Sequence, residues 1–212
     1  MSSILDLLGS SMGKELINGA SQQMGLNKAS TTSALSAAMP LILGAMKNNT
    51  SSTDGTAGLL KALGNSNHSG GGMLDNLAGI LGGDGIDESV LTDGGNILGH
   101  VFGGQENNAA NAISKSSGID MNSAMNMMKL AAPFIMSYLG KKAMSNNISD
   151  QDGISSLLGG LLGSESSTQQ DMASKLQDFD NNDFSIDDIA GLMTGGGKSG
   201  SILGTIGKLL GQ

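Results

Sequence analysis

Residues 121–139 carry the pattern that decides the fold, and they read MNSAMNMMKLAAPFIMSYL. Apolar side chains recur every three or four residues along one face of this stretch, at Met121, Met125, Met128, Ala132, Ile135 and Leu139. This spacing predicts an amphipathic helix. Pro133 lies inside the pattern and removes one backbone donor, so we expect either a kinked helix or a break into two helices.

The same pattern occurs earlier in the chain, displaced by 93 residues. The matched pairs are Gly25 and Gly118, Asn27 and Asp120, and Pro40 and Pro133, the last being the only prolines. We therefore predict an internal duplication, with copies at residues 1–105 and 106–212. The predicted fold is all-α, with two homologous small helical bundles joined by Gly/Ser/Asn-rich linkers, or alternatively one pseudo-symmetric bundle.

Each copy is expected to open with a polar helix that ends at the matched glycine. The first of these helices is predicted near Ser11–Met24 and its counterpart near Asn107–Ser117. Glycine is the usual left-handed residue after a helix end. Asn27 and Asp120 follow two residues later, where their side-chain oxygens are expected to cap the next helix.

The composition supports helices and argues against sheets. The chain has 212 residues, which suits one or two domains. It contains 4 Phe, 1 Tyr, no Trp and only two valines, so little material favours strands. Leu, Ile, Ala and the 14 Met are good or acceptable helix residues and must build the core.

Several classes of function are excluded by what the chain lacks. It has no Cys, which excludes disulfides, a thiolate nucleophile and Cys-ligated metal centres. All 11 basic residues are lysines and the net charge is −8. Without arginine, and with few aromatic side chains, the chain is not expected to bind nucleic acid.

The sequence also gives an expectation about location. Residues Met1–Asp6 have no basic segment, so no signal peptide is expected. The longest continuous apolar run, Leu130–Met136, is far shorter than the roughly 18–20 residues of a membrane span. We therefore expect a cytoplasmic protein.

An acidic segment at residues 178–189, DFDNNDFSIDDI, resembles the start of an EF-hand or dockerin-type calcium loop. Oxygen-bearing side chains stand at positions 1, 3 and 5, and position 7 supplies a backbone carbonyl. The candidate Ca²⁺ ligands are Asp178, Asp180, Asn182, Phe184 through its carbonyl, and Asp188.

The acidic segment departs from the calcium loop in two places. Asp183 stands where the loop needs glycine, and Ile189 stands where it needs a bidentate carboxylate. The alternative is an acidic helix start, in which Asp187 and Asp188 interact with the helix dipole and no metal binds.

No motif in the chain predicts catalysis. Residues 195–199, GGGKS, resemble the end of a phosphate-binding loop, but Leu192 stands where the motif needs glycine, so a glycine linker is expected. His68 and His100 have neither a cysteine nor a serine nucleophile elbow beside them. We therefore expect a protein that is not an enzyme.

Two segments have the character of interaction surfaces. Met121, Met125, Met127 and Met128 form a cluster that either fills the core or lines a groove for a partner helix, with Met121, Met125 and Met128 as the candidate partner-binding residues. Residues 201–212 are amphipathic and locally basic, as in membrane-surface peptides. Because Ile202–Ile206 matches Ile97–Phe102, a packing helix is the alternative.

Taken in order, these motifs resemble a known family. They are Ile4–Leu8, Gly25-Leu26, an Ala-rich stretch with Pro40, Leu74–Gly79 and Ile97–Gly103, continued by Ser114–Gly118 and Leu130–Pro133. The chain resembles the bacterial "domain of unknown function 937" family. The resemblance implies an all-α, duplicated bacterial protein, maps a calcium-loop-like segment onto residues 178–188 and implies no particular activity.

Our functional expectation is a non-enzymatic interaction or scaffold protein. It would self-associate as a homo-oligomer or bind a protein partner through Leu/Met-rich helix faces, without a cofactor. One alternative is a weak calcium-binding module. A second alternative is peripheral binding to a membrane surface through the C-terminal amphipathic helix.

Overall fold

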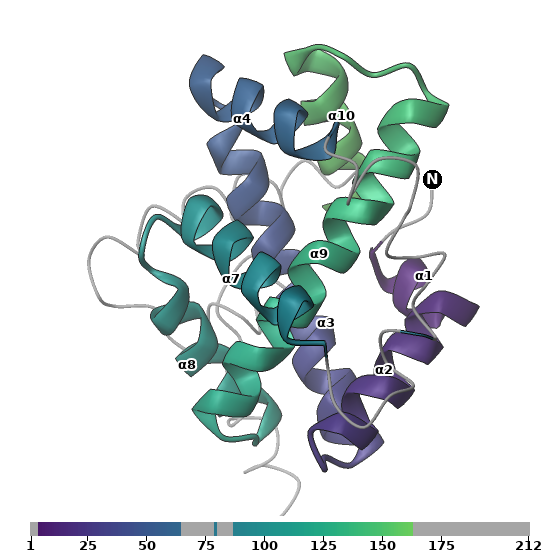
Figure 1. Ribbon diagram of the computed structural model, residues 1–212, viewed down its shortest axis with the longest axis vertical. Coiled ribbons are helices and arrows are strands. Elements are labelled where there is room, and N and C mark those ends of the chain that lie inside the picture. Colours follow the sequence, from purple (N-terminus) through teal and green to yellow (C-terminus); the bar gives the residue numbers. More distant parts are fainter. Residues whose placement is uncertain (1–3, 65–78, 80–86, 163–212) are drawn as a thin grey trace, which may run out of the picture.

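The computed structural model describes residues 4–64, 79 and 87–162 of the chain. The regular structure in these ranges is helical throughout, with eight helices and no strand (Figure 1). The prediction of an all-α protein is confirmed.

The first half contributes four helices. They are α1 (Ile4–Gly9), α2 (Ser11–Gln23), α3 (Lys28–Asn49) and α4 (Thr53–Leu63). The second group is α7 (Glu88–Phe102), α8 (Glu106–Ser117), α9 (Met121–Ser145) and α10 (Gln151–Leu162).

The two long helices, α3 and α9, cross near the centre of the molecule (Figure 1). At the lower end of the view α2 leads into α3 and α8 into α9, and at the upper end α4 follows α3 and α10 follows α9. Both long helices continue through their prolines, Pro40 and Pro133, so the expected alternative of a break into two helices is wrong.

Local hydrogen bonds end and start the helices where the sequence predicted. Gly25 and Gly118 are left-handed, with φ of 63° and 69°. Asn27 Oδ1 accepts from the Ser30 N–H at 2.8 Å, at the start of α3. Asp120 Oδ1 accepts from the Ser123 N–H at 3.0 Å, at the start of α9. These caps confirm the predicted helix boundaries to within one residue.

A further pair of hydrogen bonds closes the same two turns. Ser21 Oγ donates to the Leu26 carbonyl at 2.6 Å, and Ser114 Oγ donates to the Ile119 carbonyl at 2.6 Å. Both bonds span five residues and bridge the left-handed glycine. The two turns are therefore held in the same way, 93 residues apart.

Helices of both halves share one hydrophobic core. α3 contacts α8, α9 and α10, and α7 packs on α9. The largest fully buried side chains come from both halves, including Leu35, Ile42, Met127, Met128 and Phe134. Inside this core the hydroxyl of Ser137 is fully buried and has no hydrogen-bond partner in the part of the chain that the structure covers.

The turn of α9 that precedes Pro133 packs closely against α7. A proline leaves the carbonyl four residues earlier without its usual N–H donor, and here that carbonyl belongs to Lys129. Gly94 of α7 lies directly against it, so close that a Cβ on Gly94 would overlap the Lys129 carbonyl oxygen. Glycine therefore lets α7 rest on the turn of α9 that the proline has opened.

Helix α3 also reaches the length and apolarity of a membrane span. Its 22 residues have a window of mean hydropathy 1.3, of which 67% is buried inside the bundle. Such burial is typical of the central helix of a folded core.

Candidate functional site

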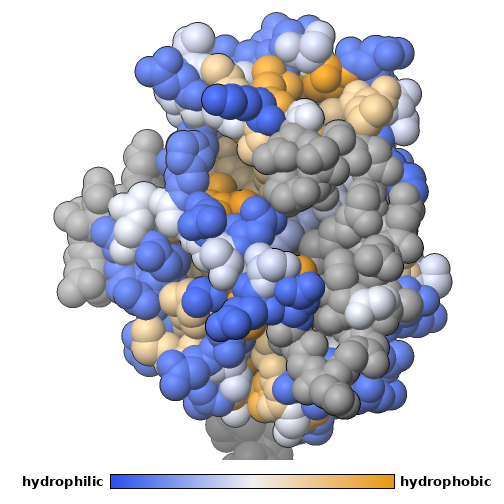
Figure 2. Space-filling model, in the orientation of Figure 1, coloured by the Kyte–Doolittle hydropathy of each residue, from blue (hydrophilic) through white to orange (hydrophobic). Residues whose placement is uncertain are grey.

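A pocket of about 320 Å³ lies between α4 and α7, above the crossing of α3 and α9. Figure 2 shows hydrophobic residues at the bottom of the hollow between these helices. Both α4 and α7 pack on α9, which places them as opposite walls.

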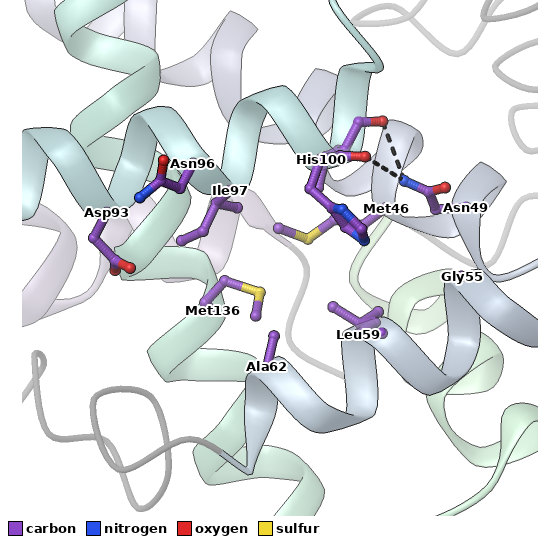
Figure 3. A pocket seen from close by; sticks show the side chains of 12 residues that line it. Met46, Asn49, Gly55, Leu59, Ala62, Asp93, Asn96, Ile97, His100 and Met136 are labelled. Carbon is purple, nitrogen blue, oxygen red and sulfur yellow. Dashed lines mark hydrogen bonds between the residues drawn. The ribbon is translucent and has the colours of Figure 1, made fainter.

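The floor of the pocket is apolar. Met46 from α3 and Met136 from α9 meet there, each only 1% exposed, and Leu59 from α4 is 7% exposed (Figure 3). The half-buried side chains of Ala62 and Ile97 extend this surface along the walls. Because thioether side chains are unbranched and polarisable, such a floor adapts to different apolar shapes.

The α4 wall is built from small residues. Gly55, Gly58 and Ala62 line the pocket from α4. Gly55 packs so closely on the Asn49 carbonyl that no side chain fits there, which fixes the start of α4 against the end of α3. Gly58 is open by comparison, since a Cβ would meet only His100 Nε2, at 3.2 Å. The backbone of α4 is therefore accessible from the pocket.

The rim of the pocket is polar and comes mainly from α7. Asp93, Asn96 and His100 stand on the face of α7 that borders the pocket, and Asn49 faces them from the end of α3 (Figure 3). The exposed imidazole of His100 reaches across toward Gly58. An apolar floor with a small number of polar groups around it is typical of a ligand-binding pocket.

Asn49 holds the mouth of the pocket in place. Its Nδ2 donates to the carbonyls of His100 and Val101, each at 3.2 Å. These carbonyls lie in the last turn of α7, where intrahelical donors are missing. One side chain of α3 thus caps α7, 51 residues further along the chain.

A second long-range contact joins the two halves beside the pocket. The Thr50 carbonyl accepts from Gln151 Nε2 at 2.9 Å and from Thr56 Oγ1 at 3.1 Å. This carbonyl therefore connects the end of α3 to the first turns of α4 and α10. The pocket wall formed by α4 is anchored at its N-terminal end.

The polar side chains that line the pocket are few. The lining has one imidazole, one carboxylate and two amides, and it includes neither a hydroxyl nor a thiol side chain. In residues 4–64 and 87–162 no three His, Asp or Glu side chains come together in a way that would hold a metal ion.

Shifted pKa values occur elsewhere, at helix starts and beside the core. Hydrogen bonds from Ser123 lower the pKa of Asp120, and hydrogen bonds from Ser89 lower the pKa of Asp87. Burial lowers the pKa of Lys47. The two aspartates cap α9 and α7, so their shifts reflect capping and not a reactive site.

The methionines proposed as partner-binding residues divide between surface and core. Met121 is 43% exposed and Met125 is half-buried, whereas Met128 is fully buried. Met128, like Met127, packs in the core, so these side chains do not form one continuous open groove.

Other predicted sites fall outside the described residues. They are the calcium-loop residues Asp178, Asp180, Asn182, Phe184 and Asp188, the glycine stretch 195–199, His68 and the segment 201–212. His100, for which we expected no catalytic role, lies on the rim of the pocket.

Sequence reasoning missed the pocket itself. One signal was present: Gly55, Gly58 and Ala62 place three small residues on one face of α4. The facing wall on α7 gives no local sign of its neighbour. Only the packed structure places Met46 and Met136 together beneath both walls.

The described helices thus define an all-α bundle with one half-open apolar pocket. The sequence profile of a family described as bacterial protein of unknown function (DUF937) matches residues 6–142, and the chain belongs to this family. Every residue that lines the pocket lies within the matched range. No curated protein and no solved structure matches the chain.

Proposed function

We propose that this chain is a non-enzymatic interaction module that binds an apolar helix face of a partner protein in the pocket between α4 and α7. The observation that carries the proposal is the adaptable floor of Met46, Met136 and Leu59 between two helical walls. Helix-in-groove recognition uses apolar anchors spaced along one helix face.

The size and shape of the pocket support this occupant. A volume of about 320 Å³ is near the lower end of ligand pockets, which range over roughly 300–1,000 Å³. It suits a few apolar side chains better than a large cofactor. The glycine-lined wall of α4 lets a partner backbone approach closely, and each buried Leu or Ile anchor contributes about 1.5–3 kcal/mol.

Charge indicates the kind of partner. The chain carries a net charge of −8, and the one carboxylate at the pocket is Asp93. Opposite charge on a partner speeds the encounter and sets its orientation. We therefore expect a helix with apolar anchors on one face and lysine or arginine beside them.

The test is selection from a displayed library of helical peptides. Gly58→Leu fills the pocket, since its side chain meets only the end of His100, and removing a helical glycine favours α4 by up to about 1 kcal/mol. Ala57→Leu is the matched control, because Ala57 is exposed on the same helix outside the pocket lining.

The wild-type chain and the Ala57→Leu variant should enrich peptides with an i, i+3/i+4, i+7 apolar pattern and basic flanks. The Gly58→Leu variant should not. Equal enrichment by all three chains, or none by the wild type, would refute the proposal. Light scattering of each chain distinguishes a partner helix from self-association.

We also infer that the two halves arose by duplication and are joined by Gly/Ser/Asn-rich linkers. The matched left-handed glycines, side-chain caps and serine-to-carbonyl bonds, all 93 residues apart, support this inference. Two unrelated segments would not be expected to share three kinds of contact at the same offset.

A further inference from the structure

The end of the chain has the chemistry that the pocket is proposed to bind. Residues 201–212 read SILGTIGKLLGQ and lie outside the described residues. Their apolar residues follow helical spacing, at 202, 203, 206, 209 and 210. After Asp188 the chain contains two lysines, Lys198 and Lys208, and no further Asp or Glu. This basic, apolar segment is opposite in charge to the chain as a whole, which carries a net charge of −8.

The same short pattern is already buried elsewhere in this fold. Residues 202–206, ILGTI, repeat residues 97–101 of α7, ILGHV. In α7, Leu98 is 1% exposed, and Ile97 and Val101 line the pocket. Helix α7 packs on α3 and α9, and these three residues belong to the hydrophobic core or pack against it. A segment of this pattern therefore fits the apolar faces that the central helices offer.

The last described helix packs against one wall of the pocket. Helix α10 ends at Leu162 and contacts α4, the small-residue wall. The 38 residues from 163 to 200 separate it from the final segment. A flexible chain of that length would have a root-mean-square end-to-end distance of about 31–37 Å. Tethering of this kind gives an effective concentration of about 1 mM.

We propose that residues 201–212 bind in the pocket of their own chain and compete there with the partner helix. This inference rests on the proposed function for the kind of helix that the pocket accepts. The pocket lies inside the family match at residues 6–142, whereas the segment lies beyond it. The chain thus carries a competing ligand for its own pocket.

The absence of cysteine makes a distance measurement direct. Spin labels are placed on the full chain through Lys61→Cys, on the exposed side of α4, and Ser201→Cys, on the polar face of the segment. Pulsed dipolar spectroscopy should give one short, narrow distance. That distance should disappear with Gly58→Leu and persist with Ala57→Leu.

A second variant changes the C-terminal segment and not the pocket. Ile206→Asp leaves the pocket unchanged and removes an apolar anchor, so the short distance should also be lost. An equimolar mixture of the two singly labelled chains should give no short distance if binding is within one chain. A short distance in that mixture overturns the proposal in favour of exchange between two copies, and a broad wild-type distribution overturns it outright.

The competition has a measurable size. If the free segment binds with a Kd of about 0.1 mM, an effective concentration of about 1 mM weakens an external peptide about tenfold. A fluorescent library-selected peptide should therefore bind the Ile206→Asp chain about tenfold more tightly than the wild type. Equal affinities overturn competition while leaving the proposed function intact, whereas failure of peptide selection on every chain refutes the proposed function itself.

Discussion

Replacing Gly94 by alanine is expected to destabilise the bundle, although alanine is the better helix former. Gly94 rests on the Lys129 carbonyl of α9, and an added Cβ would lie 2.6 Å from the carbonyl carbon and 2.8 Å from the Cα of that residue. Favourable contacts between carbon atoms are about 3.5–4.0 Å long. Since the obstacle is backbone, α7 must move away by roughly 1 Å.

The size of the effect follows from two opposing contributions. Overpacking of this kind costs about 1–3 kcal/mol, and a shift of roughly 1 Å weakens the packing of Leu98 and Phe102 on the core. The gain in helix propensity is about 1 kcal/mol. We expect a net loss of up to about 2 kcal/mol in the free energy of unfolding, which lowers Tm by up to roughly 4–8 °C.

Gly99 is the matched control within the same helix. It is exposed, and nothing lies within 4 Å of an added Cβ. Gly99→Ala should therefore raise the unfolding free energy by up to about 1 kcal/mol. Urea unfolding followed by circular dichroism measures both variants at an unchanged m-value. If Gly94→Ala is as stable as Gly99→Ala, the close approach of α7 to α9 is refuted.

Three further changes test other contacts. Asn49→Ala removes two hydrogen bonds to the end of α7, and we expect a loss of about 1–2 kcal/mol in urea unfolding and faster amide exchange in the last turn of that helix. Ser137→Ala removes a buried, unpartnered hydroxyl and should raise the unfolding free energy by about 1 kcal/mol. Because hydrogen bonds from Ser123 lower the pKa of Asp120 below 3.8, its stabilising effect is complete above that value and is lost as the pH falls through the lowered pKa. The stability advantage of the wild type over Asp120→Asn should therefore shrink on acidification.

Each of these expectations has an outcome that contradicts it. Unchanged amide exchange in α7 would mean that Asn49 does not cap that helix. A loss of stability in Ser137→Ala would reveal a hydrogen bond that the structure lacks. An Asp120 carboxyl signal that titrates at its ordinary pKa in NMR, or a stability difference independent of pH, would refute a charged cap.

The helix caps were predictable from sequence because they depend on neighbours. Asn27 and Asp120 bond to residues three positions away, and Gly25 and Gly118 relieve a purely local backbone constraint. Continuity through Pro133 was one of two expected outcomes, and the local sequence could not decide between a kinked helix and a break because packing around that turn contributes. That packing involves Gly94, which is remote in sequence.

The pocket was hidden from sequence for the same reason. Its mouth depends on Asn49 reaching α7 across 51 residues, and the anchoring of its α4 wall depends on Gln151 reaching Thr50 across 101. Its floor joins Met46 and Met136, which local patterns assign only to the core. The calcium loop and the C-terminal segment stay predictions, since they fall outside the described residues.

Because helices of both halves share one hydrophobic core, the fold has a consequence for synthesis on the ribosome. Helix α3 buries its apolar face largely against α8, α9 and α10, and α7 packs chiefly on α9. At about 5–20 residues per second, the interval between completion of Asn49 and Leu162 is roughly 6–23 s. Throughout that interval the apolar face of α3 stays exposed, because the helices that bury it have not yet been synthesised. The native state must therefore be reached after most of the chain has been translated, and a prematurely terminated half would be a target for chaperones and proteases.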